Sequence, residues 1–169
     1  MSDLRFKDRF RIPSARLSGW DYRSAGVYSV TICTHPRVCW FGEIVDGQVE
    51  LSREGRVVAE EWRKIPRIRP HAILDEWIVM PDHMHGVLIF QSRPTDKQSQ
   101  DETSRLLAQS LGSVVGQFKS KATKRIRMDL KRPTFAWEPR FHDTLLREPA
   151  DLERLRAYIR ANPSRWKPP

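Results

Sequence analysis

The 169-residue chain has no apolar run close to the roughly 20 residues that a membrane-spanning helix requires. Its first stretch, residues 1–11, is charged throughout and lacks the apolar segment of a secretory signal peptide. Only two cysteines are present, Cys33 and Cys39, which fits a compartment where thiols stay reduced. The sequence has no internal repeat. These absences argue against membrane, secreted and repeat proteins, and they predict a cytoplasmic location.

The chain also has fewer acidic than basic residues: it contains 30 lysines and arginines and 21 aspartates and glutamates, which gives a net charge of +9. A basic surface of this size favours polyanions, most often nucleic acid. The chain is long enough to form one hydrophobic core. We therefore expect a basic N-terminal arm over residues 1–20 and a single domain over residues 21–169.

Cys33, His35 and Cys39 lie close together and could be read as part of a zinc site. No second cluster in the sequence supplies a fourth ligand at the spacing of usual zinc sites. The favoured interpretation is that Cys33 is a buried residue at the end of a strand.

Residue patterns predict strands interleaved with helices. β-branched and apolar runs predict strands over 26–34, 38–45 with a short continuation after Asp46-Gly47, 72–80, 84–90 and within 135–146. The short Pro81-Asp82 break predicts that the third and fourth of these strands pair as a hairpin.

Helical spacing predicts three helices. They are expected from Ser52, as N-cap, to Pro66 and Pro70; from Ser104 to Leu130; and from Pro149 to Ala161, with Asp151 in the first turn and Pro163 as the stop. The polar residues 92–103 are expected to form a loop. This order of elements predicts an α+β fold with an antiparallel sheet covered by helices on one face.

The sharpest local feature is His83-Met84-His85. Side chains alternate between faces along a strand, so the two imidazoles are expected side by side while Met84 turns away. Two such histidines can bind one divalent cation, or they can be polar residues without a ligand. The buried apolar residues on both sides of the motif favour metal binding.

Two histidines leave a metal site incomplete, so a further ligand is expected from elsewhere in the chain. The candidates are Asp75, Glu76, Asp82 and Asn162. Oxygen ligands of this kind suit Mg²⁺ or Mn²⁺ acting on a phosphate.

Tyr158 lies at the border of the apolar stripe that Leu152, Leu155 and Ile159 form on the last predicted helix. Asn162 follows one turn later on nearly the same side. Helix position alone favours a border residue with a packed ring and a solvated hydroxyl.

Four segments, WIVMPDHMHGVLIF, LGSVVGQFKSKATKRI, WEPRFHDTLLR and YIRANPSRW, resemble REP-associated tyrosine transposases in sequence and in order. The opening DYRSAGVYSVTICTH also resembles the first strand of that family, so the resemblance covers residues 20–166. The family belongs to the HUH single-tyrosine transposase class, named for two histidines that flank an apolar residue.

The resemblance implies a ferredoxin-like sheet and assigns roles to residues. His83 and His85 become ligands of Mg²⁺ or Mn²⁺, Asn162 becomes the third ligand, and Tyr158 becomes the nucleophile. The implied reaction is nicking and transfer of single-stranded or hairpin DNA through a 5′-phosphotyrosine, by a monomer or a homodimer.

Basic residues on one face of the second long helix are candidates for phosphate contacts. They are Lys119, Lys121, Lys124, Arg125 and Arg127. Trp137 and Phe141 could stack on bases or belong to the core, and His142 and Asp143 receive no role. Two alternatives to the transferase remain open: a nucleic-acid-binding module without catalysis, and a metallonuclease that uses water.

Overall fold

The computed structural model describes residues 5–6, 9–10, 20–92 and 109–168. Most of the predicted arm, the predicted loop from residue 93 onward and the predicted helix start at Ser104 therefore lie outside the described residues. Two short strands, β1 (Arg5–Phe6) and β2 (Arg9–Phe10), pair with each other.

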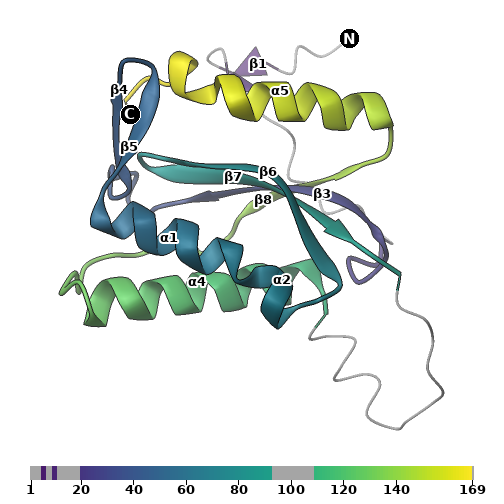
Figure 1. Cartoon of the computed structure of the whole chain (residues 1–169), viewed down its shortest axis with the longest axis horizontal. Helices are drawn as coiled ribbons and strands as arrows, with labels where there is room; N and C mark the ends of the chain where they lie inside the picture. Colours follow the sequence, from purple (N-terminus) through teal and green to yellow (C-terminus); the bar gives the residue numbers. More distant parts are fainter. Residues whose placement is uncertain (1–4, 7–8, 11–19, 93–108, 169) are drawn as a thin grey trace, which may run out of the picture.

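A four-stranded antiparallel sheet forms the centre of the fold, in the order β6-β7-β3-β8 (Figure 1). Its strands are β3 (Gly26–Cys33), β6 (Ala72–Met80), β7 (His83–Phe90) and β8 (His142–Leu146). Helices connect β3 to β6 and β7 to β8, which gives the expected ferredoxin-like arrangement. The predicted hairpin of residues 72–90 is confirmed as β6 and β7.

A smaller hairpin follows β3. It consists of β4 (Gly42–Val45) and β5 (Gln48–Leu51), and Asp46 and Gly47 form its turn as predicted. Its first strand begins at Gly42 rather than at Val38.

The helices are α1 (Arg53–Arg63), the short α2 (Ile65–Ile68), α4 (Leu111–Met128) and α5 (Pro149–Arg165). Ser52 caps α1 as predicted, because its hydroxyl accepts a hydrogen bond from the Gly55 amide at 3.0 Å. Ser110 caps α4 in the same way, so this helix begins at Leu111.

Pro163 does not stop α5, contrary to the sequence-based expectation. It lies two residues before the end of the helix, and the Trp166 amide still closes the last turn on the Pro163 carbonyl. A proline near a helix end removes only one backbone hydrogen bond, which this last turn tolerates.

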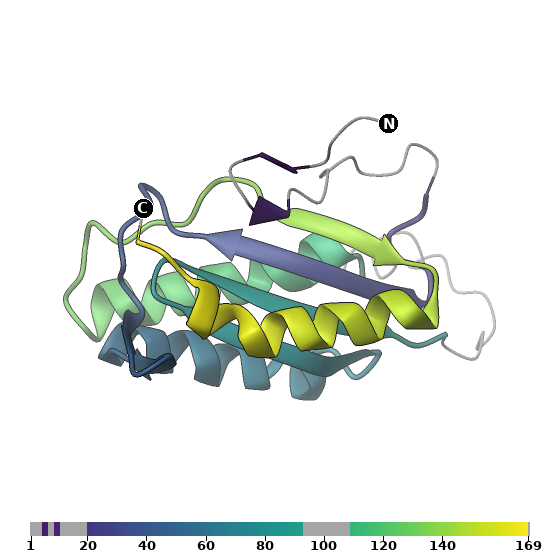
Figure 2. The same ribbon diagram turned by 90° about the horizontal axis from the view of Figure 1, so that it is seen from above.

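Helices cover both faces of the sheet rather than one. Helices α1 and α4 lie on one face, and α5 crosses the other (Figures 1 and 2). The second face carries the apolar side chain of Val87, which is fully buried and would be exposed to solvent without a covering layer. The α+β class with an antiparallel sheet and packed helices is confirmed.

The alternation of side chains along β3 and β7 separates the two faces. The core face points toward α1 and α4 and carries Tyr28, Val30, Ile32, Met84 and Leu88, all at most 2% exposed. The site face points toward α5 and carries Thr31, Cys33, His83 and His85.

Gly86 allows close packing on the core face. A Cβ at this position would lie 2.3 Å from the Trp62 ring of α1, which is fully buried. The glycine that follows the two histidines therefore has a packing role. None of the described helices is long and apolar enough to cross a membrane.

Candidate functional site

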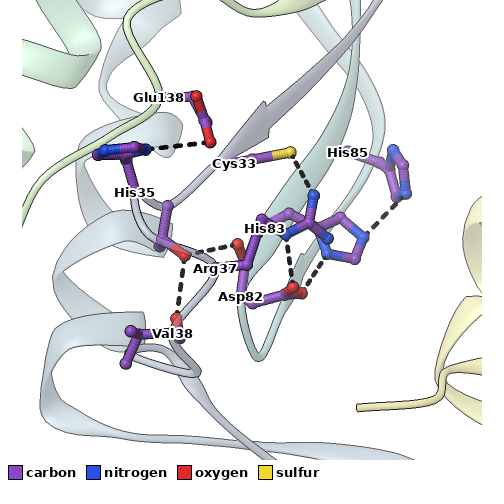
Figure 3. Close-up of polar contacts among 9 residues, drawn as sticks. Cys33, His35, Arg37, Val38, Asp82, His83, His85 and Glu138 are labelled. Carbon is purple, nitrogen blue, oxygen red and sulfur yellow. Dashed lines mark hydrogen bonds and ion pairs between the residues drawn. The ribbon is translucent and has the colours of Figure 1, made fainter. Parts of the chain in front are cut away.

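The two histidines of β7 face each other on the site face. Their Nε2 atoms are 3.1 Å apart and their ring centroids 4.7 Å apart (Figure 3). Met84, between them, is fully buried in the core. The predicted side-by-side arrangement of His83 and His85 is confirmed.

Asp82 fixes the orientation of His83. One carboxylate oxygen of Asp82 accepts a hydrogen bond from His83 Nδ1 at 2.6 Å, and the other accepts one from Arg37 Nε at 2.7 Å (Figure 3). Burial alone would raise the pKa of Asp82, but the contacts with His83 and Arg37 outweigh it and hold the pKa well below its usual value. In the neutral form of His83, the ionised carboxylate would keep the proton on Nδ1, so that the lone pair of Nε2 points toward His85.

Thr31 holds His85 from the neighbouring strand. The two residues are register partners in the β3–β7 ladder, and Thr31 Oγ1 lies 2.8 Å from His85 Nδ1. Burial lowers the pKa of His85, and the charges of His83 and Arg37 act in the same direction. His85 is therefore a neutral imidazole at pH 7, which is the form that binds metals.

The geometry of this pair fits a divalent cation. A metal about 2.1 Å from two nitrogens at an angle of about 90–110° requires those nitrogens to be about 3.0–3.4 Å apart. The observed separation of 3.1 Å falls in this range. Each histidine also has an oxygen partner on its other nitrogen, as metal-binding histidines usually do. Within the described residues, histidine, cysteine and acidic side chains form no group of three that could hold a metal, so a third ligand from this part of the chain would be of another type.

Tyr158 of α5 lies next to the histidine pair. Its ring packs edge-on against His85, with the centroids 5.6 Å apart. Tyr158 itself is half-buried. The fold thus brings the C-terminal tyrosine and the central hairpin together, which is the spatial relationship that the resemblance requires.

Asn162 lies one turn beyond Tyr158 and is 7% exposed. Residues four apart share a helix face, so Asn162 and Tyr158 lie on the same side of α5. Its amide oxygen is a ligand type that Mg²⁺ and Mn²⁺ accept. Its role as third ligand stays a prediction.

Two of the other candidate ligands, Asp75 and Glu76, have different partners. Asp75 accepts hydrogen bonds from both Nε and Nη2 of Arg156, and Glu76 accepts one from Arg160 Nε at 2.8 Å. The sequence pattern did not reveal these pairs, because they join β6 to α5 over more than 80 residues.

A cavity of about 340 Å³ lies next to the residues that contact His85 and Asp82. It is lined by Thr31, Cys33, Arg37, Glu138, Arg140 and His142. Thr31 and Arg37 connect it to the site, since they contact His85 and Asp82. Sequence reasoning missed Thr31, Arg37 and Arg140 because strand register and loop packing decide their position.

The basic residues predicted to bind DNA lie on α4, which packs against the core face and not the site face. Lys121 and Lys124 are exposed. The other three have protein partners: Arg125 pairs with Glu60 and Glu61, Lys119 donates to the Glu138 carbonyl, and Arg127 donates to the Phe135 carbonyl. Their contacts with DNA stay a prediction.

Of the two aromatic candidates, Trp137 is 8% exposed and packs against Phe41 and Phe118 in the core. Of the two roles considered for Trp137, base stacking and core packing, the structure therefore supports core packing. Cys33 ends β3 and is buried, as expected, while Cys39 is exposed.

Comparisons with known proteins bear on the family and the fold of the chain. No family model matches the chain. A Haemophilus influenzae protein described as uncharacterized is 30% identical over 161 residues, which cover 91% of this chain and 89% of that protein. The solved structure of a REP-associated tyrosine transposase bound to a REP hairpin matches with a TM-score of 0.60 and 20% identity, over 85% of this chain and 70% of that one. The similarity to this transposase structure shows that the two proteins share a fold.

Proposed function

The chain belongs to the family of the Haemophilus influenzae protein and shares the fold of a REP-associated tyrosine transposase, and on this basis we propose that it nicks and transfers single-stranded DNA. The observation that carries the proposal is the contact between Tyr158 and His85, whose imidazole is paired with that of His83. A phenol beside a two-histidine metal site is suited to attack a phosphate.

The proposed cofactor is Mg²⁺ or Mn²⁺, held by His83 and His85 with Asn162 as the third ligand. When bound, such a cation neutralises negative charge on a phosphate and stabilises the charge that develops during attack. Asp82 and Thr31 would keep both imidazoles oriented toward it.

Tyr158 would be the nucleophile. Its phenol oxygen forms a bond to phosphorus, the bond from phosphorus to the 3′ oxygen breaks, the phenol loses its proton and the departing 3′ oxygen gains one. The products are a 5′-phosphotyrosine and a free 3′-hydroxyl. Because the phosphotyrosine is still an ester, another 3′-hydroxyl can attack it and rejoin strands without ATP.

The cavity lined by Thr31 and Arg37 would hold the DNA strand next to the cleaved bond. Arg140 and His142 are exposed at its wall, and no hydrogen bond or ion pair of either side chain is found among the described residues. Arginine there can bind a phosphate oxygen, and an unpaired base can stack on its guanidinium. The substrate proposed is single-stranded or hairpin DNA, like the REP hairpin in the related structure.

The test is incubation of the purified protein with labelled hairpin DNA that carries a single-stranded flank, with Mn²⁺ or with EDTA. The proposal expects a covalent protein–DNA adduct that survives denaturant, forms only with Mn²⁺ and is absent in Tyr158→Phe. The control variant is Tyr22→Phe, since Tyr22 packs against Tyr28 and the core rather than the histidines.

The same assay separates the alternatives. Cleaved DNA without an adduct would indicate a metallonuclease that uses water. Bound but intact DNA, equally with Mn²⁺ and EDTA, would indicate a binding module. Either result would overturn the proposed transferase.

A further inference from the structure

An irregularity in β6 places two acidic residues on the site face. Leu74 pairs with Leu88 and Trp77 pairs with Gly86, so β6 has two residues where β7 has only Val87. Leu74 and Trp77 both pack against the core. In a regular strand, residues three apart point to opposite faces, so this bulge leaves both Asp75 and Glu76 able to reach α5.

Both acids pair with arginines that flank the tyrosine. Arg156 makes a forked contact with the two carboxylate oxygens of Asp75, and Arg160 contacts Glu76 through Nε and Nη2. The Asp75 side chain is 13% exposed and that of Arg156 is 26% exposed. Forked arginine–carboxylate contacts fix direction as well as distance. Tyr158 lies midway between the two arginines in sequence.

Apolar packing of α5 is confined to a narrow stripe of the helix. The main core cluster, as far as the chain is described, contains no α5 residue. Ile159 is the one fully buried apolar side chain on the helix apart from Pro163, and Leu152 and Leu155 are half-buried. A helix with so narrow an apolar contact depends on its polar contacts for a defined position.

We propose that the pairs Arg156–Asp75 and Arg160–Glu76 position the nucleophile helix, holding Tyr158 against His85 in the same chain. The two acids are thus positioning residues. The catalytic consequence rests on the proposed function, whereas the docking of α5 on the β6 bulge does not.

The chain offers a matched pair of variants. Arg154 and Arg156 both lie on α5 and each pairs with an acid three residues earlier, but only Arg156 also reaches β6. The experiment compares Arg156→Gln with Arg154→Gln in two measurements. Amide hydrogen exchange over residues 152–162 is followed without DNA or metal, and the single-turnover rate of adduct formation is followed at saturating hairpin DNA with Mn²⁺.

Arg156→Gln should speed exchange in α5 about fivefold, because the contact with β6 is lost. The adduct rate should fall about tenfold with unchanged DNA affinity, since a misplaced nucleophile slows attack without weakening binding. Arg154→Gln should leave exchange and rate within about twofold of the wild type, as exposed pairs contribute little. Arg156→Lys should recover part of both effects because it keeps the charge but not the fork.

Three outcomes are decisive. Unchanged exchange and unchanged adduct rate in Arg156→Gln would overturn the positioning proposal. Weaker DNA binding with a normal rate at saturation would also overturn it, and would make Arg156 a DNA contact. Faster exchange in Arg156→Gln, together with no adduct in the wild type, would support the docking of α5 and refute the proposed transferase.

Discussion

On β3, Val30 and Ile32 point into the packing between the sheet, α1 and α4, whereas Thr31 between them hydrogen-bonds His85 below α5. On β7, Met84 is fully buried in the core, whereas His83 and His85 on either side face each other. Apolar contacts hold the core face together, while hydrogen bonds and ion pairs dominate the site face. Because side chains alternate along β3 and β7, the same two strands provide stability on one face and the candidate site on the other.

Among these variants, Tyr158→Phe should have the largest effect on the chemistry of the site face and almost no effect on the stability that the core face provides. The variant removes only the hydroxyl, so adduct formation should fall below detection while the ring contact with His85 is kept. Adduct gels and thermal unfolding measure the two properties. A variant that still formed the adduct would show that another group is the nucleophile.

Replacing His83 or His85 by alanine should cost at least about 100-fold in the adduct rate, since each variant removes a metal ligand. Mn²⁺ binding measured by titration calorimetry should weaken in parallel. Met84→Leu is the control between them, because it changes a core-face side chain at nearly constant volume. Equal Mn²⁺ affinity in all three variants would contradict a histidine metal site.

Gly86→Ala should act on the opposite face. The added methyl group would meet the Trp62 ring, so unfolding free energy should fall by about 1–3 kcal/mol. Chemical denaturation measures this loss, and Mn²⁺ affinity should hold as long as the variant is folded. A loss of Mn²⁺ affinity without loss of stability would mean that the two faces are not separate.

The smallest expected effect is a change in the pKa of Asp75, on the β6 bulge. Hydrogen bonds from Arg156 lower the pKa of Asp75, so its carboxyl should titrate below the ordinary value of about 3.9. Because the folded pKa is depressed, the pair stabilises the fold above the unfolded pKa, and this contribution disappears as the pH falls through the folded pKa. Carbon-detected NMR of the carboxyl follows this titration, and Arg156→Gln should raise its midpoint toward the ordinary value.

The sequence predicted the parts of the fold that depend on local pattern. The hairpin around Pro81-Asp82, the Ser52 cap and the pairing of His83 with His85 follow from alternation and capping rules, and all are confirmed. The second helical layer was missed because the position of α5 depends on packing against a sheet face that also carries Val87. Periodicity in α5 does not show which face it covers.

The partners of the site residues were harder to predict. Asp82 was a candidate ligand, and it orients His83 instead, which its place next to that histidine in sequence could have indicated. Thr31 could not be found, because its contact with His85 depends on the register between β3 and β7. Asp75 and Glu76 were candidate metal ligands, but they form ion pairs with Arg156 and Arg160. These pairs depend on a bulge in β6 that no sequence pattern predicted.

The most direct measurement is mass spectrometry of a trypsin digest of the protein after reaction with hairpin DNA and Mn²⁺. Trypsin releases residues 157–160, a peptide in which Tyr158 is the one residue with a hydroxyl side chain. We predict that a nuclease-trimmed 5′-phosphonucleotide is attached to this peptide and to no other. Attachment to a peptide that contains Tyr22 or Tyr28, or adduct-free cleavage, would contradict the assignment of Tyr158 as the nucleophile.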